Sequence, residues 1–150
     1  EQSAYPGGLT YSGHPLACAA AVESISIFAE DDLCGRSRRL GDELIGPGLA
    51  EIGAAHPSVG EVRGMGCFFA LELVRDPGTR EPLVPFNASG ADAAPMNEVL
   101  AAVRERGVWP FAQYNRIHIA PPLVIGEDEL QRGLEGLDAA LSVADSFVNS

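Results

Sequence analysis

Hydrophobic residues recur at helical spacing most clearly in the last quarter of the chain. Leucines stand every three or four residues between positions 130 and 141, and Ala144 and Val148 continue the same stripe. Three consecutive acidic residues, 127–129, precede the stripe and would fall in the first turn, where the helix dipole favours anions. The pattern predicts a long amphipathic helix at the C-terminal end.

A second apolar stripe at helical spacing begins near Leu33 and extends to Ile52. The tripeptide Gly46-Pro47-Gly48 interrupts it. A proline at this point removes a backbone donor and clashes with the preceding turn. We therefore predict a second helix that is kinked or broken at Pro47.

Four short apolar runs predict β-strands: 59–63, 67–74, 108–111 and 116–120. The first two are joined at Gly64-Met65-Gly66, and Pro121 ends the last one, because proline cannot donate to a strand ladder. The run 67–74 is almost continuously apolar, which predicts a strand that is covered on both faces. A helix over 96–106 separates the two pairs of strands, and residues 79–92 are expected to be irregular.

The beginning of the chain differs from the rest. Residues 1–12 form a Gly-rich loop, and Pro15 then predicts the first turn of a helix that runs to about Ala29. Alanines near its start give this helix a face of small side chains, so we expect another backbone to cover it. The order of elements predicts an α+β fold within the broad α/β class, with helices packed on a small sheet. The loop and first helix resemble the end of another unit.

Charge and composition narrow the function. Acidic residues outnumber basic ones by 21 to 10, which gives a formal net charge of −11. This balance argues against nucleic acid and against anionic membrane surfaces as partners, since both are bound through Lys and Arg. No apolar stretch is long enough to span a bilayer. The three cysteines are widely spaced, which favours reduced thiols and a cytoplasmic location.

All ten basic residues are arginines, and the chain contains no lysine. A lysine amine is the nucleophile that forms Schiff bases with carbonyl compounds. This chain alone therefore cannot complete a mechanism of that kind. The three histidines are scattered without the spacing of metal ligands, so no metal site is expected either.

The segment Thr10-Tyr11-Ser12-Gly13 places hydroxyl groups and a glycine directly before the first predicted helix. Backbone N–H groups, a hydroxyl donor and the positive end of a helix dipole can together hold a phosphate. The same residue types also serve as an ordinary helix start. The segment alone leaves both interpretations open.

Three landmarks of the sequence resemble one protein family. Residues 8–21, GLTYSGHPLACAAA, resemble the signature segment of class III aminotransferases, which are pyridoxal-phosphate enzymes of fold type I. Residues 59–66, VGEVRGMG, resemble the strand that opens the small C-terminal domain of that family, and residues 119–125, IAPPLVI, resemble its last conserved loop. The landmarks occur in the order of the family and cover essentially the whole chain.

The resemblance implies that residues 1–30 end a large cofactor-binding domain and that residues 31–150 form the small C-terminal domain. Thr10 matches the threonine that donates to the phosphate of pyridoxal phosphate across the interface of a homodimer, and Leu9 lines the same site. In the family, the Schiff-base lysine and the residues around the cofactor ring precede this segment. We therefore expect a C-terminal fragment that has no catalytic residue of its own and is inactive alone.

The usual anchors of the family for a substrate carboxylate are missing. Many members have an arginine three residues before the Pro-Pro pair, where this chain has His118, and some ω-transaminases have one ten residues before it, where this chain has Phe111. Arg116 would lie on the same strand face as His118, so either could contact a substrate anion. The alternative is a packed strand residue at His118 and a solvated charge at Arg116. Trp109 and Phe111 could supply an apolar wall.

These inferences predict an aminotransferase dependent on pyridoxal phosphate. The amino group would pass from an amine, an ω-amino acid or a taurine-like amino sulfonate to a keto acid acceptor. The alternative is a non-catalytic module that keeps the small domain of the family for binding or dimerisation.

Overall fold

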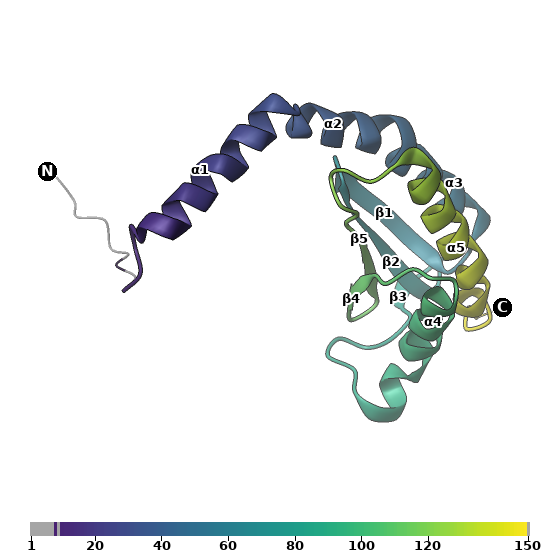
Figure 1. The fold of residues 1–150 in the computed structure, drawn as a ribbon. Coiled ribbons are helices and arrows are strands. Elements are labelled where there is room, and N and C mark those ends of the chain that lie inside the picture. The colour runs from purple at the N-terminus through teal and green to yellow at the C-terminus, as the bar shows by residue number, and fades with distance from the viewer. Residues whose placement is uncertain (1–7, 9, 150) are drawn as a thin grey trace, which may run out of the picture. The chain divides into compact units, whose positions relative to one another are not determined.

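The computed structural model describes Gly8 and residues 10–149, and the chain divides into two compact units, Glu1–Cys34 and Gly35–Ser150. In the first unit, a short turn leads into α1 (Pro15–Glu30), drawn in purple in Figure 1. No residue of α1 is buried by the described part of the chain, and Leu16 and Ile25 are 75% and 70% exposed. The cover that we expect over the small-residue face of this helix is therefore not supplied by these residues.

The remaining elements are helices and one small sheet. They are α2 (Leu33–Leu40), the π-helical segment η1 (Gly41–Ile45), α3 (Gly46–Ala55), β1 (Val59–Met65), β2 (Phe68–Asp76), β3 (Glu81–Pro82), the 3₁₀ segment η2 (Gly90–Ala93), α4 (Ala94–Glu105), β4 (Phe111–Gln113), β5 (Arg116–Ile119) and α5 (Glu127–Asp145). All strand pairs are antiparallel, in the order β1-β2-β5-β4, with β3 paired to β2. This architecture confirms the α+β prediction.

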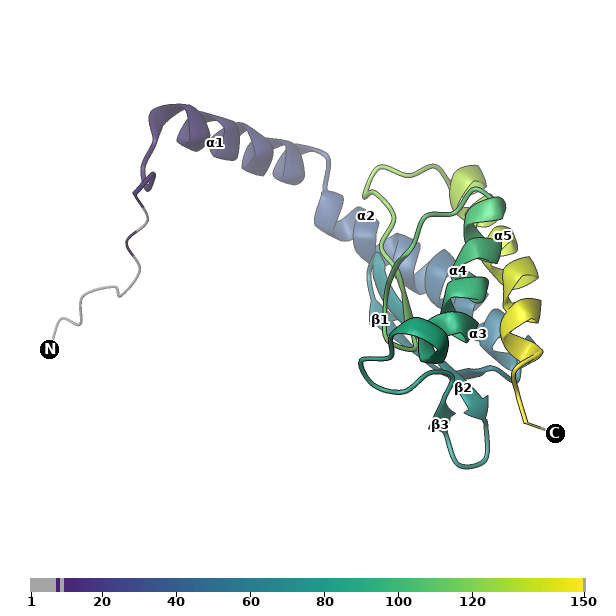
Figure 2. The same ribbon diagram turned by 90° about the horizontal axis from the view of Figure 1, so that it is seen from below.

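Helices α3, α4 and α5 gather on one side of the sheet, as the two views in Figures 1 and 2 show. Leu71 of β2 and Ile117 of β5 lie on this side and are fully enclosed. The leucine stripe of α5 packs into the same core, and Leu141 has no exposed surface. One face of each central strand therefore packs into the core, and the alternate side chains point away from the core.

The strand boundaries differ from the sequence prediction at two turns. The first hairpin turns at Gly66, where φ is +56°, which lies within the predicted turn, but Gly64 and Met65 still belong to β1. Strand β4 begins at Phe111 rather than at residue 108, because Pro110 just before it has no N–H to donate to a ladder.

The helix after Leu33 is not broken at Pro47. The helical backbone continues from α2 into α3, and the irregularity is the π-helical η1 that precedes the proline. Pro47 falls in the first turn of α3, where its missing N–H is tolerated. The proline therefore follows a change of helical type. Of the kink or break predicted at this point, the break is wrong.

His56 links the end of α3 to α5 through two side-chain contacts. Its Nδ1 lies 2.6 Å from Asp145 Oδ2 and its Nε2 lies 3.1 Å from Asp138 Oδ1. Asp145 Oδ1 also accepts hydrogen bonds from the backbone N–H of Ser58 at 3.2 Å and from its hydroxyl at 2.6 Å. Because carboxylates only accept, His56 serves both aspartates fully when both ring nitrogens carry a hydrogen. The protonated ring therefore joins two aspartates of α5 to the α3–β1 connection.

We expect the stability of the chain to fall as the pH rises from about 6.5 through the raised pKa of His56, because of this bridge. Burial lowers the pKa of His56, but the hydrogen bonds and charges of Asp145 and Asp138 outweigh burial and leave the pKa raised above 6.5. The stabilisation is complete below the unfolded pKa and is lost as the pH rises through the folded one. Urea unfolding across this range measures the slope, and His56→Gln should flatten it; an equal slope in the variant would contradict the bridge.

Candidate functional site

The side chains that point away from the helices form a second face of the sheet, which we call the open face. By strand alternation and register it comprises Glu61, Arg63 and Met65 of β1, Phe68, Ala70 and Glu72 of β2, Phe111 and Gln113 of β4, and Arg116 and His118 of β5. Met65, Phe68 and Phe111 are 82%, 57% and 66% exposed. The prediction that the second strand is covered on both faces is therefore wrong at its Phe68 end.

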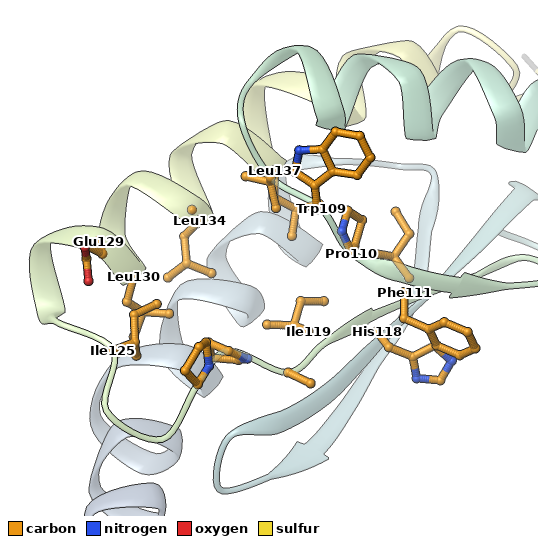
Figure 3. Close-up of a pocket in the computed structure, with 16 residues that line it drawn as sticks. Trp109, Pro110, Phe111, His118, Ile119, Ile125, Glu129, Leu130, Leu134 and Leu137 are labelled. Atoms are coloured by element: carbon orange, nitrogen blue, oxygen red, sulfur yellow. The ribbon is translucent and has the colours of Figure 1, made fainter.

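His118 lies between two aromatic rings on the open face. Phe68 stacks on the imidazole with ring centroids 5.8 Å apart and planes 25° apart, and Phe111 lies on it at 5.2 Å. Figure 3 shows the rings of His118 and Phe111 side by side. Both imidazole nitrogens are enclosed and have no hydrogen-bond partner among the described residues.

The surroundings of His118 favour a neutral imidazole. Burial lowers its pKa below 6.5, and the positive charges of Arg116 and Arg63 lower it further. An arginine in the position of His118 would carry a permanent charge. His118 is therefore an uncharged, polarisable group near neutral pH, with two nitrogens that the described residues leave unsatisfied.

Most charges of the open face pair with one another. Arg63 donates to Glu72 at 2.9 Å and lies 3.1 Å from Glu61, which also receives Arg80 at 2.9 Å. Burial raises the pKa of Glu72, but the hydrogen bond and charge of Arg63 outweigh this and leave the pKa lowered. These side chains form a compensated network across β1 and β2.

Arg116 lies opposite Glu72 in the strand register, and its charge helps to lower the pKa of Glu72, but it forms no ion pair in this network. Its guanidinium lies 5.6 Å from the centre of the Tyr114 ring, and among the described residues it makes no ion pair. Arg116 and His118 occupy alternate positions of β5, on either side of the fully buried Ile117. The structure thus brings the two candidate substrate residues to one face, where Arg116 makes no ion pair with the described residues.

An apolar cavity of about 380 Å³ lies between the β4–β5 edge of the sheet and α5. In Figure 3, Ile119 points toward Leu130 and Leu134 of α5, away from the rings of His118 and Phe111. Trp109 lines the cavity yet is 79% exposed, and Arg104 lies 5.5 Å from the centre of its ring. Trp109 and Phe111 are thus surface residues, as an apolar wall requires.

Thr10 belongs to the first unit, in an exposed turn before α1. Gly13 has a φ of +75°, and the N–H of His14 donates to the carbonyl of Tyr11 at 3.2 Å. No side chain of the described residues caps the N-terminus of α1. The first-turn N–H groups and the Thr10 hydroxyl are therefore open to an anion. The other predicted cofactor residue, Leu9, lies outside the described residues.

The described residues carry neither a metal site nor a membrane span. No group of three or more metal-ligating side chains comes together among them. None of their helices combines the length and the apolar character needed to cross a membrane.

Comparison with known proteins identifies the family. The sequence model of "Aminotransferase class-III" matches residues 2–141, which is nearly the whole chain. The chain belongs to the class III aminotransferase family. The match includes both the Thr10 turn and the open-face residues of β5.

Individual relatives agree with this assignment. The 4-aminobutyrate aminotransferase of Escherichia coli (strain K12) is 36% identical over 135 residues, covering 87% of this chain and 29% of the relative. The 5-aminovalerate aminotransferase of Pseudomonas aeruginosa is also 36% identical, over 86% of this chain and 29% of its own length. The chain thus spans less than a third of the curated relatives that it matches.

Solved structures share the fold. The taurine:2-oxoglutarate aminotransferase from Bifidobacterium kashiwanohense, in complex with PLP and glutamate, superposes with a TM-score of 0.85 at 34% identity, covering 94% of this chain and 31% of that one. An amine transaminase from an uncultivated Pseudomonas species, in its PLP-bound form, superposes with a TM-score of 0.81 at 36% identity, covering 91% and 29%.

Proposed function

We propose that the protein to which this chain belongs transfers an amino group from an amine donor to a keto acid acceptor, using pyridoxal phosphate. The observation that carries the proposal is the family match over residues 2–141, which spans two surfaces suited to the reaction. One is the uncapped helix start beside Thr10, and the other is the open face with Arg116 and His118.

Thr10 and the start of α1 would hold the phosphate group of the cofactor. The exposed hydroxyl and the unpaired first-turn N–H groups are donors, and the helix dipole adds positive potential. When bound, pyridoxal phosphate supplies the electron sink that amino transfer requires. The chain has no lysine, so the amine that anchors the cofactor must come from residues outside this sequence. Chain residues therefore bind and orient, and by themselves they are expected to be inactive.

The proposal also covers the arrangement of the whole protein. Residues 1–30 would end the cofactor-binding domain, and residues 31–150 would be the small domain. In a homodimer, Thr10 and Leu9 of one protomer would reach the cofactor of its partner. Cys18, Cys34 and Cys67 are free thiols, which supports a cytoplasmic location.

The open face suits a donor that carries an acidic group. Taurine and ω-amino acids have such a group at the end of a short carbon chain, and proteins named for 4-aminobutyrate and for taurine are among the relatives and solved structures. Arg116 and His118 are the residues of this chain that we place against the substrate.

Amino transfer by the full-length protein tests the proposal. We expect glutamate to form from 2-oxoglutarate with taurine or 4-aminobutyrate as donor. Thr10→Val should weaken retention of pyridoxal phosphate about tenfold, because a charge-assisted hydrogen bond is lost, whereas Thr10→Ser keeps the hydroxyl and should behave like the unchanged protein. A protein that binds no cofactor and transfers no amino group from amine donors would instead be a binding or dimerisation module.

A further inference from the structure

We propose that Arg116 is the residue of this chain that holds the anionic group of the substrate, and that Phe68 and Phe111 make His118 an uncharged contact for the carbon chain. This inference rests on the proposed function and deepens it, because it divides the open face between two roles. The substrate class that fits is an amine with a carboxylate or sulfonate at the end of a short carbon chain.

His118 is poorly placed to receive an anion itself. Both of its nitrogens are enclosed, with Phe68 stacked on the ring and Phe111 against it, so an anion would have to displace an aromatic ring to reach them. Burial, and after it the charges of Arg116 and Arg63, lower the pKa of His118 and so disfavour a second proton on the imidazole. An aromatic sandwich instead presents carbon surface, which suits methylene groups.

Arg116 can take the anion because the hydrogen bonds of the neighbouring carboxylates go to other arginines. Glu72 stands directly opposite Arg116 in the β2–β5 register, but its Oε2 accepts from Arg63 at 2.9 Å. Arg63 and Arg80 share Glu61. Glu72 still attracts Arg116 through its charge, but no carboxylate of the described residues forms an ion pair with it. A new carboxylate or sulfonate would therefore meet a guanidinium that can still offer two parallel N–H donors.

An aromatic pair supports the Arg116 side chain from behind. Tyr114 lies under the guanidinium, and its ring packs on Phe86 with centroids 4.5 Å apart. Stacking occupies a face of the planar guanidinium and leaves its N–H edge available. Residues two apart on a strand are separated by about 6.8 Å, so the anion contact and the carbon-chain contact are one short substrate apart.

The first test uses the 150-residue chain, since it needs no enzymatic activity. Methanesulfonate is titrated into the chain and followed by NMR at the Nε–H of arginine and at the ring of His118. We expect the Arg116 signal to move and the His118 ring to respond little. Arg116→Gln should abolish the response. Arg104→Gln is the matched control, because Arg104 also stacks on an aromatic ring, that of Trp109, and it should leave the Arg116 response intact.

The same spectra test the aromatic sandwich. In the unchanged chain the pKa of His118 should lie below 6.5, and Phe68→Ala should raise it by letting water reach the imidazole. Phe28→Ala removes an exposed ring of the first unit and should have no effect. Two results would overturn the inference. One is a response of His118 to methanesulfonate that persists in Arg116→Gln, and the other is a pKa of His118 that does not change in Phe68→Ala.

The second test measures KM in the full-length protein loaded with cofactor. Arg116→Gln should raise the KM for taurine at least about tenfold more than the KM for propylamine, which has no anion. His118→Gln should not discriminate between the two donors; the reverse ranking of the variants would contradict the assignment. A protein without amino transfer would refute the proposed function alone, because the titrations of the chain still decide the role of Arg116.

Discussion

Replacing Asp145 by alanine is expected to lower the free energy of unfolding by about 3 kcal/mol. The carboxylate receives the imidazole of His56 and both donors of Ser58. Ser58 has no exposed surface, so its N–H and hydroxyl would remain buried without a partner. Each buried donor left unpaired costs about 1–3 kcal/mol, and the two together account for most of the expected loss.

Asp138→Ala is the matched control for this experiment, because it removes the other aspartate that contacts His56 on the same helix. Asp138 is 52% exposed and makes a single contact at 3.1 Å, so its loss should cost less than about 1 kcal/mol. Urea denaturation of both variants measures the difference. Equal losses would mean that the buried donors of Ser58 do not determine the stability of this junction.

Local sequence patterns were sufficient to predict the helices that bury one stripe of apolar side chains. The leucines of α5 and the acidic first turn predicted that helix correctly, since each residue contributes through neighbours three and four positions away. Pro47 misled the prediction because the effect of a proline depends on its position in a helix, and η1 puts it in a first turn. The approach of Gly41 to Gly66, which η1 accommodates, is a long-range packing property.

The candidate site likewise has features that local patterns predict and features that depend on strand pairing. The period of two along a strand was enough to put Arg116 and His118 on one face. The sequence did not predict that Phe68 belongs to the site. Phe68 is in β2, and only the pairing of Ala70 with His118 brings β2 beside β5. Its signal in the sequence is an apolar run, which fits a buried strand equally well. The pairing of Arg63 with Glu61 and Glu72 likewise depends on register, so the sequence could not show that Arg116 is left without an ion pair among the described residues.

Replacing Gly41 by alanine is expected to destabilise the chain by about 3 kcal/mol, although alanine is the better helix former. A Cβ at Gly41 would overlap the backbone carbonyl of Gly66 and lie 2.7 Å from its Cα. Both contacts are with backbone, which cannot turn away as a flexible side chain can. The hairpin between β1 and β2 would have to move off η1, and this would disturb the hydrogen bond from Cys67 N–H to Ser37 Oγ at 3.0 Å.

Gly133→Ala provides the opposite case within the same chain. Gly133 lies inside α5, and a Cβ there would meet no atom within 4 Å outside the backbone of its own helix. Helix propensity alone should then stabilise the chain by up to about 1 kcal/mol. Thermal or urea unfolding of the two variants gives the comparison, in which the same substitution should change sign. If Gly41→Ala instead stabilised the chain, the β1–β2 hairpin would be able to move away from η1 at little cost. The close approach of the two backbones would then not be the reason for glycine at this position.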